Sequence, residues 1–127
     1  MDSLERIGKA EFSPTTRFAP AWTAPTFVNS WAQYTDAEYG TAGYWLQGNG
    51  KVVLRGGVMH PAAGAAGTTI FTLPVGLRPL KNKIWPVMTG NGIERLTVFS
   101  SGAVAYGGVA GTVAWLFLDP ISFWPGS

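Results

Sequence analysis

Only one side chain in this sequence could serve as an imidazole base. His60 is the single histidine and cysteine is absent, so a Ser-His-Asp arrangement would depend on His60 alone. The same counts exclude a cysteine nucleophile and a metal site built from several imidazoles or from thiolates. His60 precedes the small-residue run PAAGAAG, where we expect a loop histidine rather than a catalytic one.

Carboxylates are also few. After Phe27 the acids are Asp36, Glu38, Glu94 and Asp119, and no spacing among them favours the paired carboxyl groups of a glycosidase. Asp119-Pro120 follows an apolar run and predicts a turn in which the Asp side chain bonds the backbone just ahead of it. We therefore expect a protein that is not an enzyme and that holds no metal and no cofactor.

Aromatic residues are the best candidates for ligand binding. The chain has six Trp and four Tyr, whose rings offer flat apolar faces for sugars and polar edges for their hydroxyls. For any one of them the alternative is a place in the core or in a subunit interface. Tyr44, Trp45 and Trp85 are the preferred ligand-binding residues. Neighbours in a strand point to opposite faces, so Tyr44 and Trp45 cannot both lie in the core.

The segments that would position these side chains are typical of β-strands. From Phe27 onward, short runs rich in Val, Ile, Thr and aromatics alternate with Gly-rich turn signals, which predicts an all-β, antiparallel β-sandwich. The predicted strands are Phe27–Tyr34, Gly43–Gln47, Lys51–Met59, Thr68–Leu73, Ile84–Thr89, Ile93–Ser100, Ala103–Val109, Thr112–Leu118 and Ile121–Phe123.

Glycine-rich stretches mark the connections between these strands. GNG at 48–50 and at 90–92, and SSG at 100–102, predict tight hairpin turns; the Asn-Gly pairs suit a turn whose two central residues both need positive φ. GGVMHPAAGAAG, at 56–67, predicts either a flexible loop or a close-packed contact that admits only small side chains.

The first 26 residues differ from the rest. They carry three prolines and no sustained periodicity, which predicts an extended arm at 1–26 ahead of a head domain at 27–127. Phe12, Phe18 and Trp22 are unusual in a disordered linker. The arm is therefore either a disordered tail or an attachment device that docks on a neighbouring subunit or on a larger assembly.

Composition limits the possible partners. Charged residues make up 13% of the chain, against about 25% in ordinary soluble domains, so some surface should be hidden against copies of the chain or a partner. A net charge of +2 is too small for the basic surface that a nucleic-acid-binding protein needs, so no nucleic-acid partner is expected.

The uncharged stretch 96–118 is long enough to span a bilayer. Its alternating apolar residues and its glycines indicate strands instead, so no membrane insertion is expected.

Five motifs follow one another along the chain: WAQY, AGYWLQGNGKVVLRGGV, the corner GTTIFTLPVGLRP, IERLTVFSSGAVAYGG and WLFLDPISFWP. Together they cover about residues 31–125, and in this order they resemble the C-terminal domains of bacteriophage tail fibres and related virion proteins. The corner is similar to the family's TIFTLPxGYRP. Leu77 stands where the family usually has Tyr, and Gln47-Gly48-Asn49 replaces its usual charged turn.

The corner at residues 67–79 makes structural sense on this resemblance. Pro74 and Pro79 fix φ and withhold donors, so the strand must stop, and Gly76 allows the sharp turn between them. Arg78 is the one charge there and is expected to bond carbonyls at the corner or a neighbouring subunit. The corner is therefore expected to be a structural motif rather than a binding site.

The resemblance implies a jelly-roll-like homotrimer on the outside of a phage particle, made in the host cytoplasm. Its expected partners are other copies of itself, other virion proteins through the arm, and a host cell-surface saccharide. The short chain has no shaft or heptad repeat, so it fits either a receptor-binding tip or a trimer that decorates the capsid as a head-fibre protein.

Overall fold

The computed structural model describes residues 22–35, 38, 40–65, 68–107 and 112–127, and these contain ten β-strands and no α-helix. The strands are β1 (Ala32–Gln33), β2 (Gly43–Leu46), β3 (Val52–Arg55), β4 (Gly57–Ala65), β5 (Thr69–Thr72), β6 (Lys83–Thr89), β7 (Gly92–Val98), β8 (Ala103–Tyr106), β9 (Thr112–Phe117) and β10 (Ser122–Phe123). The predicted all-β, antiparallel, sandwich-like fold is confirmed.

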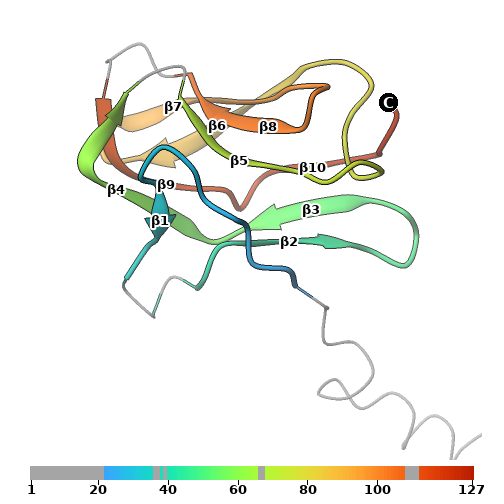
Figure 1. Ribbon diagram of the computed structural model, residues 1–127, viewed down its shortest axis with the longest axis horizontal. Coiled ribbons are helices and arrows are strands. Elements are labelled where there is room, and N and C mark those ends of the chain that lie inside the picture. The colour runs from blue at the N-terminus through green and yellow to red at the C-terminus, as the bar shows by residue number, and fades with distance from the viewer. Residues whose placement is uncertain (1–21, 36–37, 39, 66–67, 108–111) are drawn as a thin grey trace, which may run out of the picture.

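The strands form two sheets. A curled seven-stranded sheet has the order β1-β4-β9-β6-β7-β8-β5, and a three-stranded sheet has the order β10-β3-β2 (Figure 1). Every pair of neighbouring strands is antiparallel. In Figure 1, β2 and β3 lie below the strands of the larger sheet, and the core fills the space between the two layers.

One two-stranded ribbon belongs to both sheets. β3 pairs with β10 in the smaller sheet, and their continuations β4 and β9 pair with each other in the larger one. Backbone bonds carry the pairing through the bend: the Leu54 amide donates to Ile121 O at 3.0 Å and the Leu118 amide to Gly56 O at 2.9 Å. The sandwich therefore closes where this ribbon changes sheets.

Gly56 is the residue at which the ribbon turns. Its φ is +87°, a region that L side chains rarely adopt, and a Cβ placed there would lie 2.2 Å from the backbone oxygen of Thr41. Its amide N–H donates to Asp119 Oδ1 at 2.9 Å. The predicted turn at Asp119-Pro120 is present, but the predicted partner is wrong, because the carboxylate bonds a backbone 63 residues away rather than the one just ahead.

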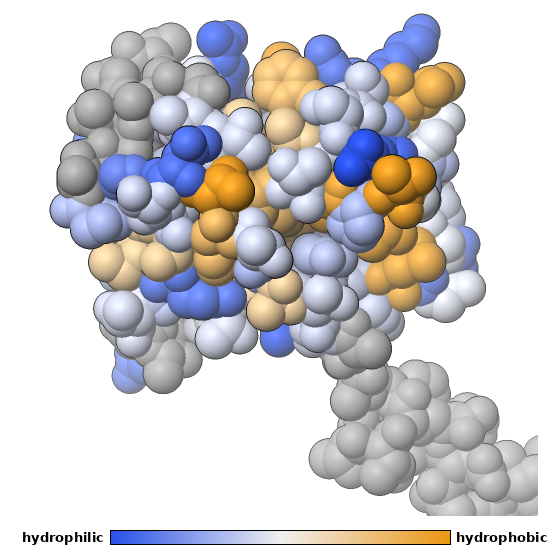
Figure 2. Space-filling view, viewed as in Figure 1, coloured by the Kyte–Doolittle hydropathy of each residue, from blue (hydrophilic) through white to orange (hydrophobic). Residues whose placement is uncertain are grey.

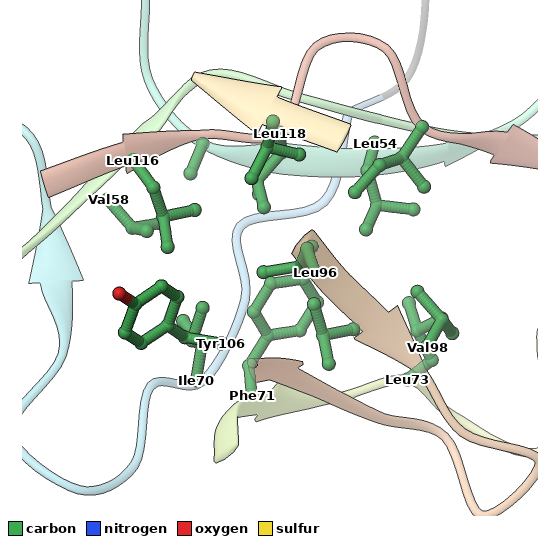
Figure 3. Packing of buried hydrophobic residues seen from close by; sticks show 14 of the residues in the cluster. Leu54, Val58, Ile70, Phe71, Leu73, Leu96, Val98, Tyr106, Leu116 and Leu118 are labelled. Carbon is green, nitrogen blue, oxygen red and sulfur yellow. The ribbon is translucent and has the colours of Figure 1, made fainter. Parts of the chain in front are cut away.

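The core between the sheets is apolar and closely packed. Figure 3 shows Leu54, Val58, Leu116 and Leu118 on one side facing Ile70, Phe71, Leu96 and Tyr106 on the other, and all of these are fully buried. Burying one such aliphatic side chain contributes about 1.5–3 kcal/mol. Alternation accounts for the pattern, since Val52 and Leu54 on β3 point inward while Val53 and Arg55 do not.

One polar pair closes the core near the β6–β7 turn. The buried Tyr106 hydroxyl donates to Glu94 Oε1 at 2.5 Å. Burial raises the pKa of Tyr106 to about 12, and the adjacent Glu94 carboxylate acts in the same direction, because both favour the neutral phenol.

The segment at 22–28 lies along the edges of both sheets. Thr23 pairs with Tyr44 on the edge strand β2, with backbone bonds of 2.9 and 3.0 Å. Phe27 pairs with Phe71 on the edge strand β5, and the Val28 amide donates to Ile70 O at 2.9 Å. Contacts with the head therefore begin inside the range predicted as the arm.

Two strand predictions and one loop prediction are wrong in detail. Lys51–Met59 is two strands, because positive φ at Gly56 sends β3 and β4 into different sheets. Phe27–Tyr34 is strand only at Ala32–Gln33, since Asn29 and Ser30 have positive φ and form a turn. For the Gly-rich run the loop alternative is wrong over residues 60–65, which continue β4 against β9 with an irregularity in register between Met59 and Gly64. His60 therefore lies on a strand rather than in a loop, and the close-packed contact stays a prediction.

The hairpin turns lie where they were predicted but differ in conformation. GNG at 48–50 joins β2 to β3, GNG at 90–92 joins β6 to β7, and SSG at 100–102 joins β7 to β8. Gly50, Gly92 and Gly102 have positive φ, whereas neither Asn49 nor Asn91 does. The predicted turn with Asn and Gly both at positive φ is therefore wrong, because the third residue of each stretch alone takes the left-handed conformation.

Substituting Gly56 tests the bend. We expect Gly56→Ala to lower the free energy of unfolding by more than about 3 kcal/mol, because the strained φ and the clash with the Thr41 backbone add together. Gly48→Ala is the matched control, since a Cβ there meets nothing within 4 Å, and it should change stability by less than about 0.5 kcal/mol. Urea unfolding measures both; equal stabilities would contradict the role of the bend.

The raised pKa of Tyr106 leads us to expect that the protein loses stability at alkaline pH. Its folded-state pKa lies above the ordinary value of 10.0, so its contribution is complete below pH 10 and is lost as the pH rises toward about 12. We expect the free energy of unfolding of the native chain to fall more steeply across this window than that of Tyr106→Phe. Parallel slopes for the two proteins would show that the phenol has no raised pKa.

Candidate functional site

The outer face of the three-stranded sheet gathers aromatic and basic side chains. Strand alternation places Trp45 on β2, and Lys51, Val53 and Arg55 on or beside β3, opposite the buried Val52 and Leu54. Trp22 and Trp124 lie against the same face. We call these six residues the tryptophan face: Trp22, Trp45, Lys51, Val53, Arg55 and Trp124. All six are half-buried or exposed.

Trp22 is held over this face by its neighbours in the chain. The Thr23–Tyr44 pairing fixes the backbone, and the indole of Trp22 then covers Gly43. A Cβ on Gly43 would lie 3.1 Å from Thr23 O and 3.6 Å from Trp22 Cβ. Gly43 therefore leaves the space that lets Trp22 lie close to the sheet.

Arg55 and Trp45 contact Trp22 on the tryptophan face. The Arg55 guanidinium lies over the Trp22 ring, 4.0 Å from its centroid, and the rings of Trp22 and Trp45 are 5.5 Å apart at 57°. Trp22 Nε1 and Arg55 Nε are both buried and have no hydrogen-bond partner. Buried donors are nearly always paired, so two such donors in contact indicate groups that a bound partner would satisfy.

Trp124 lies at the other end of the face, beside the β2–β3 hairpin. Its side chain is 49% exposed, and Lys51 Nζ lies 5.8 Å from the centroid of its ring. A Cβ on Gly50 would be 3.9 Å from the same ring, so the hairpin and Trp124 are neighbours. An indole exposed to this degree is free to stack on a flat ligand.

The electrostatic balance of this face is positive. Of the three acids in the described part of the chain, Glu94 bonds Tyr106, Asp119 bonds the Gly56 amide, and Glu38 lies between β1 and β2. Glu94 and Asp119 thus bond groups other than Lys51 and Arg55.

The structure separates the three predicted ligand-binding aromatics. Trp45 belongs to the tryptophan face, whereas Tyr44 points to the other side of β2 and stacks on Phe71, with ring centroids 6.2 Å apart at 14°. Trp85 also packs against the core, 5.8 Å from the ring of Phe123. Of the predicted arm residues, Trp22 packs on the head itself, and Phe12 and Phe18 lie outside the described residues.

The corner residues surround one hydrogen-bonded turn. Arg78 Nε donates to Leu73 O at 2.8 Å, and Gly76 takes a φ of +99° between the two prolines Pro74 and Pro79. The turn also holds the C-terminal residues, because Ser127 O accepts from the amides of Leu80 and Lys81 at 2.9 and 3.2 Å. The Leu73 amide donates to Gly102 O at 2.8 Å, so the corner joins residues 73–81 both to the C-terminal residues and to the β7–β8 turn.

The described residues show no catalytic or metal-binding constellation. His60 Nε2 lies 2.8 Å from Asn29 O, and its ring is edge-on to Trp31 at 5.2 Å. Among the residues placed by the structure, no group of three or more His, Asp or Glu side chains could hold a metal ion. Asp36 lies outside them.

A second surface is apolar rather than aromatic. On the outer side of the β6–β7 hairpin, Ile84, Met88 and Ile93 are 62%, 51% and 71% exposed, and Met88 pairs in register with Ile93. A hollow of about 390 Å³ lies beside them, lined by Met88, Phe117, Asp119 and Pro120. On the face of the molecule that Figure 2 shows, apolar side chains form separate groups among hydrophilic ones rather than one continuous patch.

Comparison with models of protein families, with curated proteins and with solved structures found no match to this chain. Within the described residues, no helix is long and apolar enough to cross a membrane. The candidate site therefore has to be interpreted from its own geometry.

Sequence reasoning did not select Trp124, Lys51 or Arg55 as site residues. Strand alternation could have placed Lys51 and Arg55 on the face of Trp45 once the GNG hairpin fixed the register. Trp124 had no such signal, because it follows a strand of only two residues.

Stability measurements distinguish core aromatics from those of the tryptophan face. We expect Trp85→Ala to lower the free energy of unfolding by about 2–3 kcal/mol, because it removes packing against Phe123 and the core. Trp124→Ala should cost less than about 1 kcal/mol, since it removes an exposed ring and one cation–π contact. Urea unfolding of both variants gives the comparison, and similar losses would contradict these placements.

Proposed function

We propose that this chain is the host-recognition head of a bacteriophage virion protein, which binds a cell-surface saccharide through the tryptophan face and acts without catalysis. The observation that carries the proposal is the gathering of three indoles and two basic side chains on one outer sheet face. Two polar atoms of this face, Trp22 Nε1 and Arg55 Nε, are buried without a hydrogen-bond partner.

The composition of the face suits a sugar. The apolar side of a pyranose ring stacks on an indole, and Trp45 and Trp124 offer two such rings beside β3. Hydroxyl groups of the ligand would find donors in the indole N–H groups and in Lys51 and Arg55.

Virion origin rests on the sequence resemblance to tail-fibre domains. Four of the five motifs fall on parts of the fold that determine its shape: the β2–β3 hairpin with the bend at Gly56, the corner at Arg78, the β7–β8 hairpin and the β9–β10 crossing. The fifth, WAQY, contains β1. A virion location and synthesis in the host cytoplasm follow if the resemblance reflects ancestry.

A homotrimer is part of the proposal. The exposed Ile84, Met88 and Ile93 on the β6–β7 hairpin support it, because an apolar patch of this kind on a chain with few charges is suited to burial against another protein surface. Other copies of the chain are the partners that we propose for this patch.

A capsid-decorating or head-fibre role is the second candidate. The same apolar patch would serve a contact with the capsid as well as one with another copy. Cryo-electron microscopy of the intact particle separates the two roles: density at the tail supports host recognition, and density on the capsid lattice supports decoration.

Cell binding tests the proposed saccharide site. We expect Trp45→Ala and Trp124→Ala each to weaken binding to host cells by roughly 5- to 150-fold, or about 1–3 kcal/mol, as for aromatic anchors at other interfaces. Phe99→Ala is the matched control, because Phe99 is an exposed aromatic on the β7–β8 turn away from this face. Unchanged binding in both Trp variants would contradict the proposal.

Removing the arm tests its role in attachment. Deletion of residues 1–21 keeps Trp22 and Thr23 on the head, so we expect a folded trimer by analytical ultracentrifugation that is no longer incorporated into particles. Normal incorporation of the truncated protein would show that attachment lies elsewhere.

A further inference from the structure

We infer that the tryptophan face selects an anionic glycan chain that lies along β3, with its carboxylate or phosphate groups at Lys51 and Arg55. This inference rests on the proposed saccharide binding and adds the class of ligand: charged rather than neutral, and an oligosaccharide rather than a single sugar.

Each of the two cations on the face contacts an indole through its side chain, Lys51 that of Trp124 and Arg55 that of Trp22. Of the acids in the described ranges, Glu94 and Asp119 bond other groups, the Tyr106 hydroxyl and the Gly56 amide. By contrast, Arg78 and Arg95 each donate through Nε to a backbone carbonyl, at 2.8 and 2.7 Å. Among the arginines of the described chain, the one on the tryptophan face thus stands apart, because its Nε has no acceptor.

The position of Arg55 favours recognition of an oxyanion. Its guanidinium lies 4.0 Å from the centroid of the Trp22 ring, which limits its freedom before any ligand arrives. A planar guanidinium presents paired N–H donors that match the two oxygens of a carboxylate or phosphate. Its Nε is buried and has no acceptor, so no hydrogen bond from this atom holds the guanidinium away from an incoming anion.

The spacing of the two charges sets the length of the ligand. Lys51 and Arg55 are four residues apart on one face of an extended chain, which corresponds to about 13 Å. Val53 lies between them, with Trp45 beside it in register on β2, and Trp124 lies next to Lys51. A ligand that met both charges and both indoles would have to extend over several sugar rings along β3.

Two matched pairs of polysaccharides test whether the tryptophan face selects anionic glycans. Polygalacturonate is compared with its fully methyl-esterified form, and dextran phosphate with dextran, because the members of each pair share one sugar backbone and only one of them carries negative charge. Binding is measured by affinity electrophoresis and by tryptophan fluorescence with the full chain. We expect at least tenfold tighter binding to the charged member of one pair, and the pair concerned identifies the anion as carboxylate or phosphate.

Variants that change one charge show whether the tryptophan face is responsible for binding the charged polymer. Lys51→Gln should weaken binding to the charged polymer about tenfold, because it removes a charge-assisted contact. Lys81→Gln is the matched control, since it removes the same charge from an exposed loop residue and should leave binding unchanged. Arg55→Lys keeps the charge but not the planar fork, and should also weaken binding.

Each other outcome would overturn the inference. Equal binding to charged and neutral polymers that is lost in Trp45→Ala would leave the saccharide site in place but remove its selectivity for anions. Equal losses in Lys51→Gln and Lys81→Gln would show general attraction to the whole protein. Binding to none of the four polymers would also reject an anionic glycan of these classes, and the cell-binding measurement would then judge the proposed function separately.

Discussion

The hydrogen bond from the Gly56 amide to Asp119 is the interaction on which the rest of the fold depends. It lies where the two strands of one ribbon leave one sheet and enter the other. Only glycine fits at this point, because a Cβ would meet the Thr41 backbone. The bend brings Leu54 of the smaller sheet into the same core as Leu116 and Leu118 beside the crossing, and so allows two thin layers to enclose an apolar interior (Figure 3).

The smaller sheet has two faces with different roles. Its inner side chains, Val52, Leu54 and Phe123, are buried in the core, whereas the outer side carries the tryptophan face. Because the core already holds this sheet in place, its outer residues do not have to be chosen for packing. That freedom explains how half-exposed indoles and the cations that contact them can occupy regular strand positions in a stable domain.

Local sequence predicted those features that depend on neighbouring residues. Alternation placed Tyr44 and Trp45 on opposite faces of β2, and the lone charge at the corner led to the expectation of a carbonyl partner for Arg78, which the structure places at Leu73. It could not predict which of Tyr44 and Trp45 faces the core, because that depends on the side on which the larger sheet packs. The break at Gly56 was missed for the same reason, since its causes, Thr41 and Asp119, are distant in sequence.

The short segment at 22–28 has a consequence for how the molecule behaves at high concentration. Exposed strand edges are templates for pairing with other chains, and this fold has open edges at β2 and at β5. Thr23 covers part of the first edge and Phe27 part of the second. The segment at 22–28 thus covers part of one edge of each sheet. A domain cut at Phe27 would lose the cover on β2 while keeping every residue of its core.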